Sequence, residues 1–300
     1  MKSILPIFEA LRPKQWTKNL VVFAALIFSE RALIFKPLAW EYALLAFVIF
    51  CGLSGSVYLL NDLTDIEKDR LHPEKRLRPI ASGQLGVNAA RGTLFLLLGI
   101  CLSTGWWIFP PLFWGSAVAF FLINIAYSFW LKNIVILDVL TIAIGFVLRA
   151  QAGVGAMQTV DPRVGMSHWL ILCTLMLALF LGLVKRRQEI MRFGDDASGH
   201  RKILEEYSPH FVDEMTGVVA ATTLIGYSLY TVAPETIARI GSNRLIYTVP
   251  FVVYGIFRYQ YLIHMRQQGE NPSAILLTDL PLQINLALWI LAVVLLIHVL

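Results

Sequence analysis

The chain has 300 residues, of which 57% are hydrophobic and only 15% are charged. In globular proteins about a quarter of the residues are charged. A soluble fold could not bury this much apolar surface, so lipid must be the solvent for most of it. The composition excludes disordered, collagen-like and disulfide-stapled chains. The net charge of +5 is weak support for nucleic-acid binding, and Cys51, Cys101 and Cys173 show neither metal nor disulfide spacing.

Nine stretches are apolar and long enough to cross a bilayer as helices, which takes about 20 residues each. In chain order they are 18–35, 39–60, 92–110, 112–131, 134–156, 167–184, 216–234, 246–263 and 282–300. The first is the weakest, because Glu30 and Arg31 interrupt its outer end. We therefore expect an all-α polytopic membrane protein, with nine transmembrane helices in a single domain over residues 1–300.

Lysine and arginine are distributed unequally between the two sides that nine spans define. With a cytoplasmic N-terminus, the inner segments hold 19 of them and the outer segments five, while Arg149 falls within a span. Cytoplasmic loops carry such an excess of positive charge. The sequence therefore predicts an integral protein of the plasma (inner) membrane, with its N-terminus and active site cytoplasmic and its C-terminus outside. Topology and attraction to anionic lipid also explain many single basic residues without a catalytic role.

The first polar cluster follows the second span, in the run N-D-L-T-D-I-E-K-D at 61–69. If the helix continues for two turns, Asp62, Asp65 and Asp69 share one face, where they repel one another unless a cation neutralises them. Hard oxygen ligands suit Mg²⁺, which often bridges carboxylates to substrate phosphates. Three basic residues that can bind phosphate oxygens follow: Lys75, Arg76 and Arg78. A magnesium site is the prediction, and a solvated loop of mixed charge is the alternative.

Two more polar clusters lie on the same predicted side of the membrane. The sixth span ends in K-R-R-Q-E at 185–189, where Lys185, Glu189 and Arg192 share a helix face. The turn between the fourth and fifth spans adds Tyr127, Lys132 and Asp138. Membrane anchoring explains a basic run, a snorkelling lysine or an interfacial tyrosine without any function. The shared side nevertheless favours one common site.

Arg149 is the deepest charged residue. It lies eleven residues past Asp138, roughly 16 Å along a helix and near the midplane of a ~30 Å apolar core. An unpaired arginine is costly there, so it should face a wet cavity or the bundle interior. Asn124 is a candidate partner, and a purely structural interhelical bond is the alternative. Gly153 and Gly155 predict close helix packing in the same span.

The polar clusters together indicate a Mg²⁺-dependent site for a phosphorylated group that opens onto a lipid-filled cavity. Such a site fits a substrate with a phosphate head and a long apolar tail. At this point the chain resembles the UbiA superfamily of intramembrane prenyltransferases over its whole length. The motifs that carry the resemblance are R-P-K-Q-W-T-K-N at 12–19, the N-D-x-x-D-x-x-x-D run at 61–69, Arg78-Pro79 with Ala81-Ser82-Gly83, and Tyr127 through Lys132.

The resemblance implies an all-helical bundle around a central cavity, in which aspartate-rich motifs hold Mg²⁺ and a diphosphate. It implies that Asp62 and Asp65 are catalytic and that Asp62, Asp65 and Asp69 bind the metal. The candidate substrate-binding residues are Lys18, Asn61, Lys75, Arg76, Arg78, Tyr127, Lys132, Asp138, Arg149, Lys185, Arg186 and Glu189.

The chain departs from family members that prenylate aromatic acceptors. These carry a second aspartate-rich motif after the sixth span, whereas this chain has the basic run at 185–189, with Glu189 and then Asp195 and Asp196 as its acidic residues. This departure, the opening motif and G-F-V-L-R-A at 145–150 resemble the branch that transfers 5-phosphoribose from phosphoribosyl diphosphate to polyprenyl (decaprenyl) phosphate, releasing diphosphate, for cell-wall arabinan precursors. A 5-phosphate, a diphosphate and a lipid phosphate in one site require additional positive charge, which the basic run supplies.

Phosphoribosyl transfer is therefore the predicted activity, with phosphoribosyl diphosphate, a polyprenyl phosphate lipid, Mg²⁺ and the membrane as partners and no nucleic acid. The first alternative is a prenyltransferase that joins a polyprenyl diphosphate to an aromatic or other small acceptor. The second is a lipid-phosphate carrier. Transporters often show inverted repeats, and the sequence has no convincing internal similarity of this kind.

Overall fold

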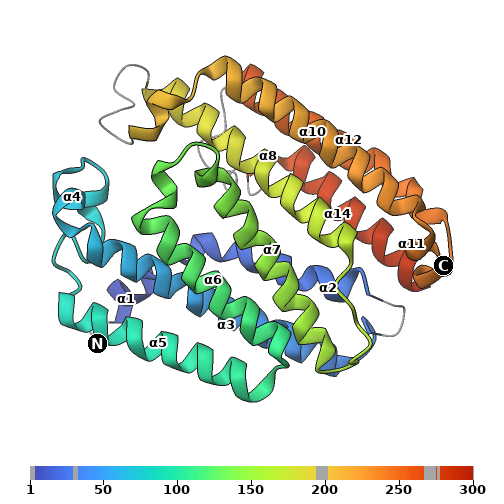
Figure 1. The fold of residues 1–300 in the computed structure, drawn as a ribbon, viewed down its shortest axis with the longest axis horizontal. Coiled ribbons are helices and arrows are strands. Elements are labelled where there is room, and N and C mark those ends of the chain that lie inside the picture. The colour runs from blue at the N-terminus through green and yellow to red at the C-terminus, as the bar shows by residue number, and fades with distance from the viewer. Residues whose placement is uncertain (1–3, 30–32, 194–201, 267–274, 276–277, 300) are drawn as a thin grey trace.

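The computed structural model describes residues 4–29, 33–193, 202–266, 275 and 278–299. Within these ranges the chain is helical and has no β-strand (Figure 1). The long helices are α3 (Pro37–Thr64), α5 (Val87–Ile108), α6 (Pro111–Phe129), α7 (Leu137–Gln158), α8 (His168–Phe193), α10 (Pro209–Val232), α12 (Val249–Arg266) and α14 (Leu280–Val294). The short α-helices are α1 (Ile4–Ala10), α2 (Ala24–Ile27), α4 (Ile66–Leu71) and α11 (Pro234–Ile240). The 3₁₀-helices are η1 (Pro13–Phe23), η2 (Lys75–Leu77), η3 (Leu131–Asn133), η5 (Lys202–Glu206) and η6 (Arg244–Thr248), and η7 (Leu295–Val299) is a π-helix.

Proline and capping side chains mark where several helices begin. Helices α3, α6 and α10 carry proline at or beside the first helical position, where the missing N–H costs no hydrogen bond. The Ser208 hydroxyl accepts a hydrogen bond from the backbone N–H of Phe211 at 3.1 Å. The Asp279 carboxylate accepts one from the N–H of Leu282 at 2.9 Å. Both bonds satisfy amide groups that a helix start leaves without partners.

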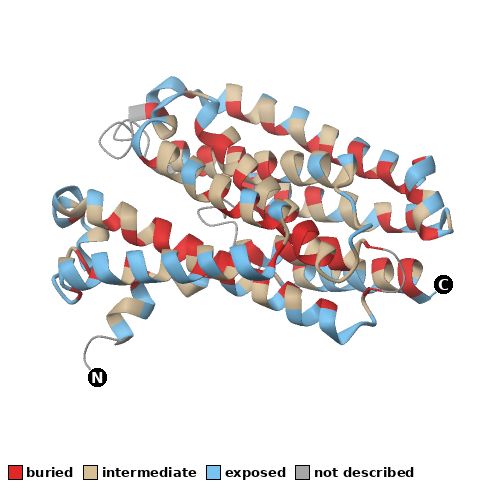
Figure 2. Ribbon diagram, turned by 60° about the horizontal axis from the view of Figure 1, so that its bottom comes forward, coloured by how far each residue is buried: buried red, intermediate tan, exposed pale blue. Residues whose placement is uncertain are grey.

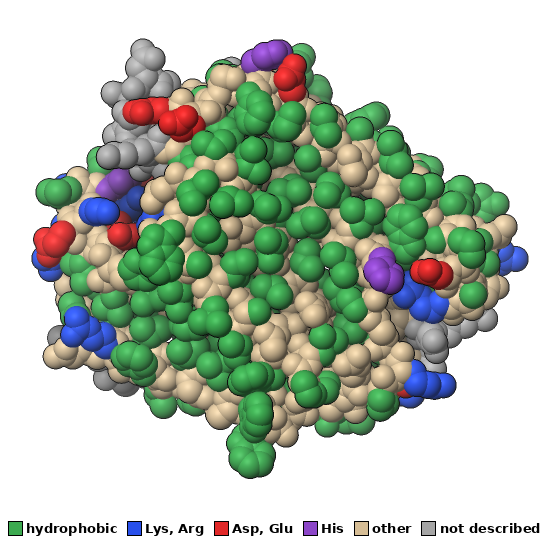
Figure 3. All heavy atoms as spheres, in the orientation of Figure 1, with side chains coloured by type: hydrophobic (Ala, Val, Ile, Leu, Met, Phe, Trp, Pro, Cys, Tyr) green, Lys and Arg blue, Asp and Glu red, His purple; other side chains and the backbone are tan. Residues whose placement is uncertain are grey.

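Seven of the nine predicted spans are confirmed as helices long and apolar enough to cross a membrane. Within the described residues these are Pro37–Thr64, Val87–Ile108, Pro111–Phe129, Leu137–Gln158, His168–Met191, Pro209–Val232 and Leu280–Val299. Hydrophobic side chains are spread across the face in Figure 3, and charged ones lie at its margins. The protein is therefore an all-helical membrane protein.

The first and eighth predicted spans differ from this pattern. The stretch 18–35 is not one helix, because 3₁₀-helical η1 gives way to the four-residue α2, and residues 30–32 lie outside the described ranges. The stretch 246–263 forms η6 and α12. Helix α12 contains arginine, glutamine and histidine side chains, so it is less apolar than the seven helices above. A count of nine transmembrane helices is not established by these elements.

Helices α3 and α7 form the centre of the bundle. In each, 61% of the most apolar stretch is buried, against 17% for α5 and α14, which lie at the edge (Figure 2). Helix α7 packs against α6 and α8, α3 packs against α5, and the η1–α2 segment packs against both α3 and α7. Several polar residues on these elements, such as Asn19 on η1, Asp62 on α3 and Arg149 on α7, are therefore buried in the interior of the protein.

Glycines let the backbone approach α7 closely at two points. A Cβ atom on Gly153 would lie 2.1 Å from the carbonyl oxygen of Val22 on η1, and one on Gly155 would lie 2.6 Å from the amide nitrogen of Phe113 on α6. No other residue type fits either contact without moving a backbone. The predicted role of these glycines in close packing is confirmed.

Candidate active site

The acidic run at 61–69 does not continue as one helix. Helix α3 ends at Thr64, Asp65 leaves the helical conformation (φ −105°, ψ 15°), and α4 starts at Ile66. The expectation that Asp62, Asp65 and Asp69 share one helical face is therefore wrong. Among the described residues, no three acidic, histidine or cysteine side chains are grouped to hold a metal ion.

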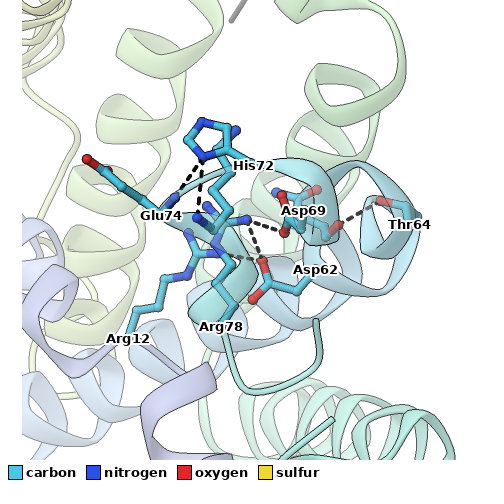
Figure 4. Close-up of polar contacts among 9 residues, drawn as sticks. Arg12, Asp62, Thr64, Asp69, His72, Glu74 and Arg78 are labelled. Atoms are coloured by element: carbon cyan, nitrogen blue, oxygen red, sulfur yellow. Dashed lines mark hydrogen bonds and ion pairs between the residues drawn. The ribbon is translucent and has the colours of Figure 1, made fainter. Parts of the chain in front are cut away.

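Two of the three aspartates instead converge on one arginine (Figure 4). Nη1 of Arg78 lies 2.6 Å from Asp69 and 3.1 Å from Asp62. Nη2 of Arg12 approaches the same oxygen of Asp62 at 2.5 Å. Both aspartates are buried, at 2% and 3% exposed, so arginine charge balances carboxylates that water cannot reach.

The acidic cluster meets the chemical requirement for a magnesium site. Mg²⁺ is usually held by one or two carboxylates, and water and substrate phosphates complete its shell. The oxygens of Asp62 and Asp69 already face a single positively charged atom, Nη1 of Arg78. A divalent ion bound by these two carboxylates therefore fits the donor set, with Asp65 on the adjoining turn.

A large cavity opens beside this cluster and runs through the bundle. Its volume is about 1060 Å³. Six of the predicted substrate-binding residues line it: Lys18, Asn61, Tyr127, Arg149, Lys185 and Arg186. Its opposite end is lined by Lys36, Asp161, Arg163 and Arg239, and apolar side chains from α2, α8, α12 and α14 lie between. Both ends of the cavity are therefore polar, and its middle is apolar.

Arg149 faces this cavity from α7, as predicted, and is 8% exposed. Its partner is Asn19 on η1, whose side-chain oxygen accepts a hydrogen bond from Nε at 2.8 Å. Asn124, the partner suggested by the sequence, instead donates to the backbone of its own helix, to the carbonyl of Phe120 at 2.7 Å. The guanidinium also lies over the ring of Phe120, 4.4 Å from its centroid.

The basic residues at the end of the sixth span have different positions and partners. Lys185 and Arg186 line the cavity. Arg187 points elsewhere and pairs with Asp213 on α10 at 2.5 Å. Nε of Arg186 donates to Asp138 at 2.7 Å, and its guanidinium also pairs with Glu189. Asp138 and Glu189 therefore lie behind the cavity wall and hold Arg186 in place.

The other predicted residues lie around the cavity without lining it. Lys75 is half-buried near the acidic cluster, where burial and then Arg78 lower the pKa of its ammonium. Arg76 is exposed on η2, and Lys132 is half-buried on η3. The later acidic pair, Asp195 and Asp196, lies outside the described residues, as does the side chain of Arg192.

Three residues of this region were not among the predicted site residues. Arg12 and Asn19 belong to the quoted motif at 12–19, so position in a motif could have drawn attention to them. Tyr207, whose hydroxyl donates to Asp138 at 2.7 Å, has no such signal. It lies 69 residues along the chain from its partner, and only the fold brings them together.

A family model described as the UbiA prenyltransferase family matches residues 20–286. The chain belongs to the UbiA prenyltransferase family. It is therefore a transferase, as predicted.

Relatives of this UbiA family member indicate which branch of the family it resembles. It is 32% identical to a decaprenyl-phosphate phosphoribosyltransferase of Mycolicibacterium smegmatis, over 95% of this chain and 90% of the relative. It is 30% identical to the protein of the same name from Corynebacterium glutamicum, over 97% of this chain and 86% of the relative. The resemblance to this branch is therefore confirmed.

Solved structures share the UbiA fold. A UbiA homolog from Archaeoglobus fulgidus bound to DMAPP and Mg²⁺ superposes with a TM-score of 0.70 at 20% identity, covering 98% of this chain and 99% of the other. The same homolog bound to GPP and Mg²⁺ gives a TM-score of 0.69. At this identity the comparison establishes the fold alone.

Proposed function

We propose that the protein transfers 5-phosphoribose from phosphoribosyl diphosphate to a polyprenyl phosphate, such as decaprenyl phosphate, and releases diphosphate. The observation that carries this proposal is the charge of the cavity wall. Its inner part is lined by four basic side chains, Lys18, Arg149, Lys185 and Arg186, whereas Asp161 is its one carboxylate among the described residues and lies at the opposite end. Asp138 and Glu189, which pair with Arg186, lie behind the wall. A site with this balance suits a reaction whose substrates carry a 5-phosphate, a diphosphate and a lipid phosphate.

The proposed reaction breaks the bond between ribose C1 and the diphosphate oxygen, whose electron pair leaves with the diphosphate. An oxygen of the lipid phosphate forms the new bond to C1. Because that oxygen is already anionic, no strong base is required. The cavity cations stabilise charge that moves onto the diphosphate, and such preorganised groups are often the largest contribution to catalysis.

A magnesium ion is the proposed cofactor, held by Asp62 and Asp69 with Asp65 and Asn61 beside them. When bound, it would neutralise the leaving diphosphate. Relatives of the same fold that are described with Mg²⁺ support this assignment. Arg12 and Arg78 lie against the same carboxylates and add donors for diphosphate oxygens. The apolar middle of the cavity offers a place for the isoprenoid tail.

We also propose that η1–α2 and α12 complete nine membrane segments in one domain over residues 1–300. The N-terminus and the acidic cluster then lie on the cytoplasmic side of the plasma membrane, and the C-terminus lies outside. The excess of lysine and arginine on the side of the acidic cluster supports this orientation. In a bacterium with arabinan in its wall, the product is a precursor of that polymer.

The decisive experiment supplies purified protein with labelled phosphoribosyl diphosphate, polyprenyl phosphate and Mg²⁺. We expect label in a lipid product. Lys185→Ala should lower turnover by about 10- to 150-fold, the effect of losing a hydrogen bond to a charged group. Arg91→Ala, which removes an exposed arginine from α5, is the matched control and should leave turnover unchanged. A protein that ignores phosphoribosyl diphosphate and joins a polyprenyl diphosphate to an aromatic acceptor would overturn the proposal.

A further inference from the structure

Tyr207 connects two segments that are distant in sequence. It follows η5, is 3% exposed, and its hydroxyl makes two hydrogen bonds of 2.7 Å. It donates to Oδ1 of Asp138 and accepts from the backbone N–H of Ile136. Burial, followed by the hydrogen bond with Asp138, raises the pKa of Tyr207 to about 12, so the phenol remains a donor at neutral pH.

Asp138 connects Tyr207 to a residue of the cavity wall, Arg186. Its second oxygen, Oδ2, accepts from Nε of Arg186 at 2.7 Å. Asp138 is fully buried and Arg186 is 1% exposed. Because Tyr207 and Arg186 occupy different oxygens, the plane of the carboxylate is fixed, and the guanidinium that it holds is fixed with it. Arg186 is the member of the three that lines the cavity.

The backbone beside Asp138 is strained. Ile136 has φ 70° and ψ −42°, a conformation that is rare and unfavourable for a β-branched residue. Such strain persists only where surrounding contacts hold it, and the bond from Ile136 N–H to Tyr207 is one of these contacts. Tyr207 therefore holds both the turn that presents Asp138 and the carboxylate itself.

We propose that Tyr207 is a positioning residue, which keeps the guanidinium of Arg186 oriented toward a phosphate group in the cavity. Tyr207 acts through Asp138 and does not touch the substrate. The proposal rests on the proposed function only in requiring that the cavity binds a phosphorylated ligand. It assigns a role in binding to a segment that no sequence motif marks.

The first test is a double-mutant cycle on protein purified in detergent. Tyr207→Phe should raise the KM for phosphoribosyl diphosphate about 5- to 20-fold with a smaller effect on kcat. In an Arg186→Ala background the same substitution should add almost nothing, because residues joined in one hydrogen-bond network couple, whereas the effects of independent residues add. Tyr42→Phe is the matched control, since Tyr42 is half-buried against Phe109 at a distance from the site. Additive effects of Tyr207→Phe and Arg186→Ala would overturn the proposal.

A second variant separates positioning from stability. Glycine adopts positive φ without strain, and the Ile136 side chain is 54% exposed, so Ile136→Gly should relieve the turn at little cost in packing. Adding it to Tyr207→Phe should restore the unfolding temperature but leave the KM raised. If the double variant recovers the wild-type KM, Tyr207 only stabilises the turn and the positioning role is wrong.

Binding of inorganic diphosphate with Mg²⁺, measured by calorimetry, distinguishes the two proposals. If the wild-type protein makes no phosphoribosylated lipid, the proposed function fails, but the role of Tyr207 is still decided by diphosphate affinity. We expect Tyr207→Phe combined with Ile136→Gly to bind diphosphate about 5- to 20-fold more weakly than Ile136→Gly alone. Equal affinities would refute the role of Tyr207 whatever the reaction is.

Discussion

Arg78 donates to two buried carboxylates that come from different helices, Asp62 on α3 and Asp69 on α4. Removing one partner of a buried ion pair is costly, because the other charge stays out of water. The break at Asp65 bends the chain so that both carboxylates reach one nitrogen. At the scale of single residues, the site therefore depends on a local interruption of a helix.

Asp62→Asn is expected to lower turnover at least 100-fold, because it removes charge from the point where two arginines and the proposed Mg²⁺ meet. Asparagine keeps the shape of aspartate, so the protein should still be recovered from membranes in a folded state. Glu67→Gln is the matched control. Glu67 lies in the same run, but its side chain is 84% exposed and pairs with the exposed Arg70. Full activity of Asp62→Asn over a range of Mg²⁺ concentrations would exclude the acidic cluster from catalysis.

Arg149 gives a second prediction at this scale. Arg149→Met should insert and fold, since it removes a charge that costs roughly 2.5–3.5 kcal/mol at a helix centre. Turnover should nevertheless fall at least tenfold, because the cavity loses a cation held by Asn19. Arg149→Lys should recover only part of it, since an ammonium cannot reproduce the planar five-donor fork of arginine. A fully active Met variant would show that Arg149 serves packing alone.

At the scale of elements, the 3₁₀-helical η1 and its N-cap carry three residues of the site, Arg12, Lys18 and Asn19. Arg12, at its start, has a left-handed backbone (φ 52°) and pairs with Asp62. Asn19 holds Arg149. The backbone of η1 lies directly on α7, where only the absence of a side chain at Gly153 leaves room for the carbonyl of Val22. The position of η1 therefore determines how the site is assembled.

Gly153→Ala should disturb this contact, because the added methyl would lie 2.1 Å from a backbone oxygen that cannot rotate away. Overpacking of this kind costs about 1–3 kcal/mol. We expect a lower unfolding temperature in detergent and reduced turnover as η1 shifts. Gly99→Ala is the matched control, since a Cβ atom there meets nothing within 4 Å. Equal unfolding temperatures for the two variants would contradict a role for Gly153 in seating η1.

Sequence patterns predicted the elements that local chemistry determines. Seven apolar spans, the burial of Arg149 and the tight packing at Gly153 follow from hydropathy, the cost of exposing a charge to lipid, and residue size. The irregular η1 was not predicted, because its conformation depends on contacts with α3 and α7. The Tyr207 bond to Asp138 was missed for the same reason, since its partners come from segments that only tertiary packing brings together.

The whole molecule separates its charged groups toward two ends. The acidic cluster, α4 and the basic end of α8 lie at one end of the bundle, and α11 lies at the other (Figure 1). The long cavity connects these ends, with Lys185 at one and Arg239 at the other. A polar substrate from the cytoplasm and a lipid from the bilayer can then meet at the polar end, provided that this end faces the cytoplasm.

Orientation in the membrane can be measured with single cysteines at the two ends. Glu67→Cys places a thiol on α4, and Glu235→Cys places one on α11; both positions are exposed. If the acidic cluster is cytoplasmic, a membrane-impermeant maleimide should label Glu235→Cys on intact cells. It should reach Glu67→Cys only after the membrane is permeabilised, because the excess of lysine and arginine holds that end inside. The protein without either new cysteine gives the background from its three native thiols. Labelling of Glu67→Cys on intact cells would invert the topology and remove cytoplasmic phosphoribosyl diphosphate from the possible substrates.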